Sequence, residues 1–285
     1  MKRILQFVLG VVLLTSCTKQ ESTENSQIEI KFSAGINTPR SKTAIDTWTN
    51  TPVGFAKGIS SSNYTEAWNA MVSYTGYVNF LPTRYYPNTA TNKVYLKGYA
   101  PQGVFSDGII TFPEMNGTQD ILLSNEQNGS ISDRFDQPDK GFAFSHSLAQ
   151  LNFTVIADSS FPLGVNLTHI IVNGTNLPVS MNVATGVITY ATTTLPITSF
   201  VGTQSITSIT SDKLGTIMVE PNKSVTLTII AGGVTYNDIA PTIENGIPLQ
   251  AGTAYTIALT FKSTQIAAMA TITPWKEMTG SGTVI

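Results

Sequence analysis

Short segments in which apolar and polar residues alternate recur along most of this chain, and this pattern constrains its fold more than any other feature. Within residues 254–262, for example, the alternating apolar side chains are Tyr255, Ile257, Leu259 and Phe261. A period of two places such side chains on one face of a β-strand and leaves the other face to water. No stretch of ten or more residues keeps the 3.6-residue period of a helix with a cap. The sequence therefore predicts an all-β protein built from antiparallel β-sandwiches.

Turn residues divide this pattern into many short strands. Strands are predicted at residues 28–36, 53–56, 71–80, 94–99, 109–112, 121–123, 148–156, 167–172, 179–183, 187–190, 216–219, 224–231, 234–239, 254–262 and 266–274. Residues 60–69 are expected to form a loop or one helical turn, and residues 125–141 an irregular polar segment. Asp158-Ser-Ser-Phe-Pro-Leu-Gly164 interrupts the alternation. We therefore expect two tandem β-sandwich domains, residues 28–158 and 159–285.

The N-terminus carries an export signal. Met1-Lys-Arg is followed by an apolar run at residues 4–14, which is too short to span a bilayer. The run ends in Leu14-Thr-Ser-Cys17, which resembles a bacterial lipoprotein signal. We expect residues 1–16 to be removed, Cys17 to carry lipid that holds the precursor on the outer membrane, and residues 17–27 to be a polar tether. Because Cys17 is the only cysteine, the core must stabilise the fold without internal disulfides.

The charge balance argues against nucleic acid as a partner. Removal of residues 1–16 takes away Lys2 and Arg3 and leaves 14 basic and 18 acidic residues, a net charge of −4. A nucleic-acid-binding domain calls for a basic patch instead. Charged residues make up 12% of the chain, well below the roughly 25% of an ordinary soluble domain. Such a surface is typical of a secreted β-protein that does not steer charged ligands.

Few residues suggest catalysis or metal binding. His146 lies between Ser145 and Ser147, but a nucleophile needs a base that is in turn oriented by a third group, so a packing role is expected. Three aspartates fall three residues apart in a polar segment, at Asp133, Asp136 and Asp139. Their spacing differs from that of a calcium-binding EF-hand loop, and a solvated loop is expected. The sequence predicts no catalytic residue, metal site or cofactor.

The strand at residues 28–36, called the opening strand below, leads into an exposed turn. Its large apolar side chains are Ile28, Ile30, Phe32 and Ile36, and Asn37-Thr-Pro-Arg-Ser-Lys42 follows. Arg40 is therefore a basic residue in an exposed position, directly before Ser41.

Six elements of the sequence together resemble the fimbrillin family of the Bacteroidales, the type V pilins. They are the signal with Cys17, Thr38-Pro-Arg40 after the opening strand, Leu96-Lys-Gly-Tyr-Ala-Pro101, Phe142-Ala-Phe-Ser-His-Ser-Leu-Ala-Gln-Leu-Asn-Phe-Thr-Val155, Pro248-Leu-Gln-Ala-Gly-Thr-Ala-Tyr-Thr-Ile-Ala-Leu259, and Ile272-Thr-Pro-Trp-Lys-Glu-Met-Thr-Gly280. They occur in the family's order and cover nearly the whole chain. The resemblance implies two transthyretin-like domains and no enzyme activity.

The resemblance also implies a route of assembly. Fimbrillins are exported as lipoproteins and then cut after an arginine in the loop that follows the first strand. Arg40 matches that position, so the mature subunit would begin at Ser41 without the lipid and the opening strand. The empty groove would take a donor strand from the C-terminal segment of a neighbouring copy or a related subunit. Within residues 266–285 the alternating positions are Ile266, Ala268, Ala270 and Ile272.

Burial energies make this route physically reasonable. Four large side chains at ~1.5–3 kcal/mol each amount to roughly 6–12 kcal/mol, about the stability of a whole domain. A subunit without its opening strand should therefore be unstable until a replacement strand arrives. Two alternatives to this route stay open. Residues 266–274 could be an ordinary last strand of the second domain, and Arg40 could be an ordinary loop residue. Arg84 and Arg134 are other exposed candidates, but a cut there would sever a domain.

Two other classes of function stay open at this stage. A surface-tethered glycan-binding lipoprotein would need exposed aromatic residues, for which the candidates are Trp48, Tyr64, Trp68, Tyr74 and Tyr77. A lipid-anchored hydrolase would need a catalytic constellation that the sequence does not provide. We expect a fimbrial subunit that supports adhesion to a host or bacterial surface ligand, first on the outer membrane and then in the fimbrium.

Overall fold

The computed structural model describes residues 27–36, 47–243, 246–263 and 265–274. These residues form twenty β-strands and no α-helix, which confirms the all-β prediction. In the described part of the chain there is accordingly no helix that could cross a membrane. Cys17, Arg40 and Ser41 lie outside the described residues, as does the segment 275–285.

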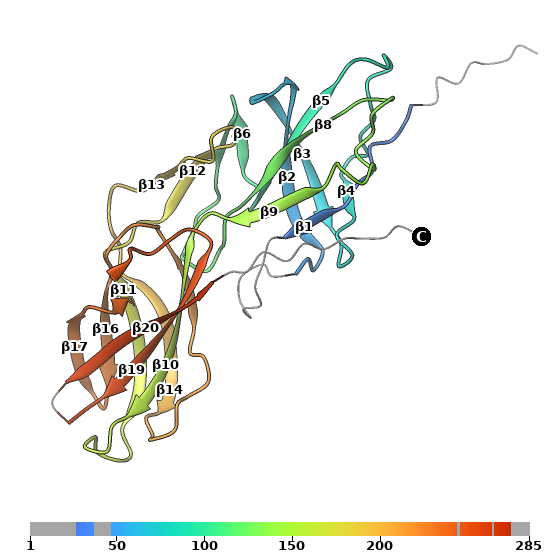
Figure 1. Cartoon of the computed structure of the whole chain (residues 1–285). Helices are drawn as coiled ribbons and strands as arrows, with labels where there is room; N and C mark the ends of the chain where they lie inside the picture. Colours follow the sequence, from blue (N-terminus) through green and yellow to red (C-terminus); the bar gives the residue numbers. More distant parts are fainter. Residues whose placement is uncertain (1–26, 37–46, 244–245, 264, 275–285) are drawn as a thin grey trace, which may run out of the picture.

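A seven-stranded sheet contains most of the N-terminal half (Figure 1). In spatial order its strands are β1 (Ala34–Ile36), β9 (Phe142–His146), β8 (Leu122–Gly129), β5 (Val94–Ala100), β2 (Thr51–Ser60), β3 (Asn63–Val72) and β4 (Val78–Phe80). All neighbours are antiparallel except β1 and β9, which run parallel. The sheet encloses a core rich in aromatic residues, among them Phe32, Phe55 and Phe142.

Three predictions in this region were wrong. The segment 125–141 is not irregular throughout, because residues 125–129 belong to β8 and residues 126–129 pair with β5. Residues 60–69 are not a loop, because β3 begins at Asn63 and pairs with β2 along its whole length. Glu66 is exposed in the same alternating phase as the buried Tyr64 and Trp68, so it hid the strand pattern. The predicted strand 71–80 is split by a turn. Gly76 adopts a φ of 81° there, and the amide of Ser73 donates to the carbonyl of Tyr77 at 2.9 Å.

The C-terminal half forms two packed sheets (Figure 1). One has the order β15 (Thr216–Val219), β10 (Ala149–Ala157), β19 (Thr253–Phe261), β20 (Ile266–Pro274) and β18 (Thr242–Ile243). The other has the order β14 (Ile197–Ser205), β11 (Asn166–Asn173), β16 (Thr226–Ala231) and β17 (Val234–Ile239). Aliphatic side chains from both sheets share one core, which gives a β-sandwich. The pairs β10–β19 and β18–β20 are parallel, unlike the remaining pairs.

A small fourth sheet joins strands from the two halves of the chain. Its order is β13 (Ile188–Tyr190), β12 (Pro178–Asn182), β7 (Ile109–Thr111) and β6 (Val104–Ser106). Met181 pairs with Ile110 across the junction, and both lie in a third core with residues from either half. The strand β10 pairs with β15 and β19 of the C-terminal sheet, although it precedes residue 158. A division into two domains near residue 158 stays a prediction.

Candidate functional site: the opening strand and its groove

The opening strand lies in a groove between two parts of the seven-stranded sheet. On one side β1 pairs in parallel with β9, with Ala34 opposite Phe142 and Ile36 opposite Phe144. On the other side it runs antiparallel to residues 76–86, through bridges between Glu29 and Tyr85 and between Ser33 and Tyr77. The opening strand therefore contacts both ends of the sheet, β9 at one end and the β4 side at the other (Figure 1).

Four main-chain hydrogen bonds attach the opening strand to residues 76–86. The amide of Ile30 donates to the carbonyl of Arg84 at 2.8 Å, and the amide of Ala34 donates to that of Gly76 at 2.7 Å. In return, the amide of Tyr86 donates to the carbonyl of Ile28 at 2.9 Å, and that of Val78 to Phe32 at 3.0 Å. Loss of the strand would leave donors and acceptors unpaired on both sides of the groove.

Burial along the strand is concentrated in its middle. Ile30, Phe32 and Ala34 are 2%, 4% and 5% exposed, whereas Ile28 and Ile36 are only partly buried. The two ends are therefore less buried than the sequence predicts, and Ala34, which lies in the same alternating apolar phase, is buried with Ile30 and Phe32. On the outer face, Lys31 pairs with Glu29 at 2.8 Å, and the hydrogen bond that Lys31 donates to this carboxylate raises the pKa of Lys31.

Phe32 lies at the centre of an aromatic cluster. Its ring centroid is 4.4 Å from Phe142 in a stacked arrangement and 5.3 Å from Phe55 in an edge arrangement. The rings of Phe80 and Phe135 lie at 5.7 and 5.5 Å. Offset and edge contacts of this kind add to the gain from burying the ring itself. The opening strand thus supplies the ring that completes the core of the N-terminal half.

Trp48 follows the predicted cleavage position in the sequence, and its side chain contacts the opening strand. Its indole N–H donates a buried hydrogen bond of 2.8 Å to the carbonyl of Ala34. Its ring meets Phe144 edge-on at 5.2 Å, and the residue is 5% exposed. No local sequence pattern predicts this contact, because Trp48 lies outside any alternating segment.

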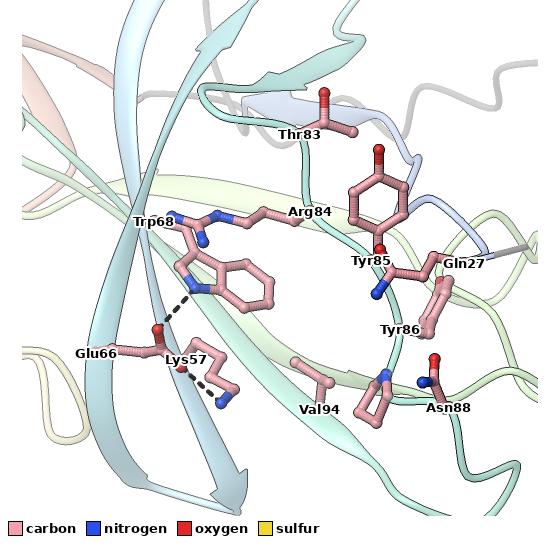
Figure 2. Close-up of a pocket in the computed structure, with 11 residues that line it drawn as sticks. Gln27, Lys57, Glu66, Trp68, Thr83, Arg84, Tyr85, Tyr86, Asn88 and Val94 are labelled. Carbon is pink, nitrogen blue, oxygen red and sulfur yellow. Dashed lines mark hydrogen bonds and ion pairs between the residues drawn. The ribbon is translucent and has the colours of Figure 1, made fainter. Parts of the chain in front are cut away.

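A polar hollow of about 380 Å³ opens where the opening strand begins, next to Gln27 (Figure 2). Figure 2 shows Glu66 accepting hydrogen bonds from Lys57 at 2.6 Å and from the indole of Trp68 at 3.2 Å. Burial alone would raise the pKa of Glu66, but these bonds outweigh it and lower that pKa. The guanidinium of Arg84 lies 5.1 Å from the Trp68 ring centroid.

The structure describes residues 266–274 of the predicted donor segment 266–285. β20 pairs antiparallel with β19 over residues 266–274 and in parallel with β18 at Met269 and Ala270. Ala268 and Ala270 are buried in the core of the C-terminal half, Ile266 packs against that core, and the backbone of Ile272 pairs with Tyr255. In the single chain these residues are therefore an internal strand, as the alternative interpretation of the sequence has it.

The aromatic residues considered for glycan binding do not form an exposed platform. Trp48, Tyr64 and Trp68 are 5%, 4% and 5% exposed and belong to cores. Tyr74 and Tyr77 are 73% and 39% exposed, next to the turn that follows β3.

His146 and one of the three aspartates singled out in the sequence, Asp133, have structural partners. His146 Nδ1 lies 2.5 Å from Asp120 Oδ2, and both side chains are almost fully buried. Asp133 forms an ion pair with Lys140 at 2.9 Å. Among the described residues no three acidic, histidine or cysteine side chains gather as metal ligands would.

The comparison with protein families identifies the chain. A family model described as fimbrillin-like matches residues 18–275. The chain belongs to the fimbrillin-like family. Membership indicates a fimbrial protein that assembles with copies of itself or related subunits at the cell surface. It points to a structural and adhesive role rather than to an enzyme. A search of curated proteins gave no match.

Solved structures share the fold of this fimbrillin-like chain. A candidate cell adhesion protein from Bacteroides uniformis has a TM-score of 0.63 at 18% identity, covering 87% of this chain and 99% of the other. One from Bacteroides ovatus has a TM-score of 0.55 at 17% identity, covering 90% and 99%. One from Bacteroides fragilis has a TM-score of 0.52 at 12% identity, covering 89% and 99%. Likeness at these identities concerns the fold.

Proposed function

We propose that this fimbrillin-like protein is a fimbrial subunit that matures by losing its opening strand and polymerises by accepting a donor strand in its place. The observation that carries the proposal is the position of the opening strand. It is hydrogen-bonded on both sides and supplies Phe32 to the core, yet it belongs to the N-terminal end of the chain. An extended segment from a neighbour could restore both sets of main-chain bonds.

Processing would occur in the segment between the opening strand and Trp48. A cut after Arg40 would separate residues 17–40, with the lipid on Cys17 and the opening strand, from a subunit that begins at Ser41. The lipid would hold the precursor at the outer membrane until that cut. The released subunit would have a bare groove with an unfilled place at Phe32, and this would favour assembly over persistence as a monomer.

The donor segment would lie within residues 266–285 of a neighbouring copy or in the C-terminal segment of a related subunit. Ile266, Ala268, Ala270 and Ile272 are its candidate inward-facing residues, but donation by them requires release of β20 from β19 and β18. The free energy of that release opposes exchange, and pairing in the neighbour's groove must offset it. We therefore expect exchange to depend on processing, which creates the groove that a donor can occupy.

The test is intact-mass measurement and N-terminal sequencing of fimbriae sheared from the native cell surface. We expect a start at Ser41 without lipid. The variant Arg40→Ala should remain an unpolymerised precursor with lipid on Cys17, while Lys42→Ala, two residues further along the sequence, should be processed normally. Normal fibres from Arg40→Ala would refute cleavage at this residue. A mature chain that starts at lipidated Cys17 would favour a permanently anchored subunit or a tethered glycan-binding protein.

A further inference from the structure

The groove accommodates side chains of different size at three successive inward-facing positions of the strand that fills it. The place of Ile30 is closed, since this side chain is only 2% exposed. The place of Phe32 is bounded by four rings, so an aromatic side chain fills it best. The place of Ala34 is 5% exposed within the same core, so a larger side chain there would overpack it.

The main chain at Ala34 is held from two directions. Its amide donates to the carbonyl of Gly76, and its carbonyl accepts from the indole of Trp48. Gly76 lies so close that a Cβ on it would come within 2.5 Å of the Ala34 carbonyl oxygen. Main-chain carbonyls of a strand point to alternate sides, so a hydrogen bond from a fixed indole excludes a shift of one residue. A shift of two residues is excluded by the different side-chain places at Ile30, Phe32 and Ala34.

Trp48 and Gly76 both follow Arg40 in the sequence, so they stay with the subunit when the opening strand leaves. We propose that they form a register lock for the incoming strand, and that the groove selects an extended segment with a large aliphatic, an aromatic and a small residue at alternate positions. This inference rests on the proposed function. The partner it describes is a related fimbrial subunit whose segment carries that pattern.

The protein's own C-terminal segment lacks this pattern. The alternating residues of 266–272 are isoleucines and alanines, with no aromatic residue among them. Trp275 is aromatic, but Glu277 stands two residues later, where the groove requires a small uncharged side chain. A strand from residues 266–285 should therefore fill this groove less well than the opening strand does.

The experiment uses the full chain with a specific protease site placed in residues 37–40. After the cut, a fluorescent peptide of residues 27–40 is exchanged into the groove, and unlabelled peptides compete with it. The native peptide and its Lys31→Gln variant, which changes an outward-facing residue, should compete equally. Peptides with Phe32→Ala or Ala34→Leu, and a peptide of residues 266–285, should compete at least about tenfold less well.

A second measurement isolates the lock. Trp48→Phe keeps a ring beside Phe144 but removes the N–H, so the native peptide should dissociate about fivefold faster. Trp68→Phe is the matched control, because the indole of Trp68 donates to Glu66 and not to the strand.

The outcomes distinguish a failure of the register lock from a failure of the proposed function. Equal competition by every peptide, or equal dissociation from the Trp48 and Trp68 variants, would overturn the register lock while leaving a replaceable strand. Failure of the native peptide to enter the groove would overturn the lock together with the proposed function.

Discussion

The ring of Phe32 stacks on the ring of Phe142, with centroids 4.4 Å apart and planes inclined by 27°. One ring belongs to the opening strand and the other to β9. The core of the N-terminal half therefore depends on a segment that the proposed processing removes. Under that proposal the precursor has a complete core, and the cut subunit lacks the ring that packs on Phe142.

Truncation of this ring should measure how much the opening strand contributes. Phe32→Ala should lower the free energy of unfolding of the uncut chain by about 3–5 kcal/mol, because it leaves a cavity among four rings. Equilibrium denaturant unfolding followed by tryptophan fluorescence would measure the change. Lys31→Ala, on the exposed face of the same strand, should leave the midpoint unchanged. A comparable midpoint for both variants would show that the strand does not support the core.

Gly76 should be sensitive to substitution because of its contact with the opening strand. Gly76→Ala introduces a Cβ 2.5 Å from the Ala34 carbonyl oxygen at a φ of 81°. Gly233→Ala is a matched control, since Gly233 has a φ of 79° and nothing within 4 Å of its added Cβ. The control should cost about 1–2 kcal/mol of stability, from backbone strain alone. Gly76→Ala should cost about 1–3 kcal/mol more. Equal costs in thermal unfolding would contradict the close approach.

The buried pair Asp120–His146 should be structural. Asp120→Ala removes the carboxylate that lies 2.5 Å from His146 Nδ1 and should lower stability by about 3–5 kcal/mol. Asp139→Ala, at an exposed position of the polar segment, should leave stability unchanged. Denaturant midpoints of the two variants would test this, and a neutral Asp120→Ala would argue against a structural role for the pair.

Glu126 should make stability depend on pH in the acid range. It accepts hydrogen bonds from Ser61 Oγ at 2.7 Å, from the Ser62 amide at 2.8 Å and from the Tyr64 hydroxyl. Burial would raise its pKa, but these bonds outweigh it and hold the pKa below the ordinary 4.5. The unfolded chain therefore takes up the proton first as pH falls. The stabilisation is complete above about pH 4.5 and is lost as the pH drops through the folded value.

Unfolding free energies from pH 7 to pH 3 would measure this contribution. Glu126→Gln cannot ionise at this position, so its free energy of unfolding should fall less steeply as the pH drops than that of the native chain. The difference in stability between the two proteins should therefore shrink towards pH 3. An identical slope for both proteins would show that Glu126 does not contribute to the pH dependence.

Much of the strand content could be predicted, because alternation is a local property. The strands β5, β10, β11 and β19 lie within a residue or two of their predicted bounds. The misses have local causes as well. Glu66 interrupts the apolar phase of β3, and β14 is a mostly exposed edge strand whose polar residues show little alternation. A turn at Gly76, which has a positive φ, divides the segment 71–80 that was predicted as one strand.

By itself, the sequence determined the all-β class, the inward phase of Ile30 and Phe32 and the resemblance to fimbrillins, and it predicts an export signal. These follow from periodicity and from motifs that are contiguous in the chain. Only the tertiary structure decided that Phe32 meets Phe142, that Trp48 binds the carbonyl of Ala34, and that β7 pairs with β12. Alternation says which face a residue occupies, but sheet order and register decide its partner. Those depend on the packing of residues far apart in the chain, which no local pattern specifies.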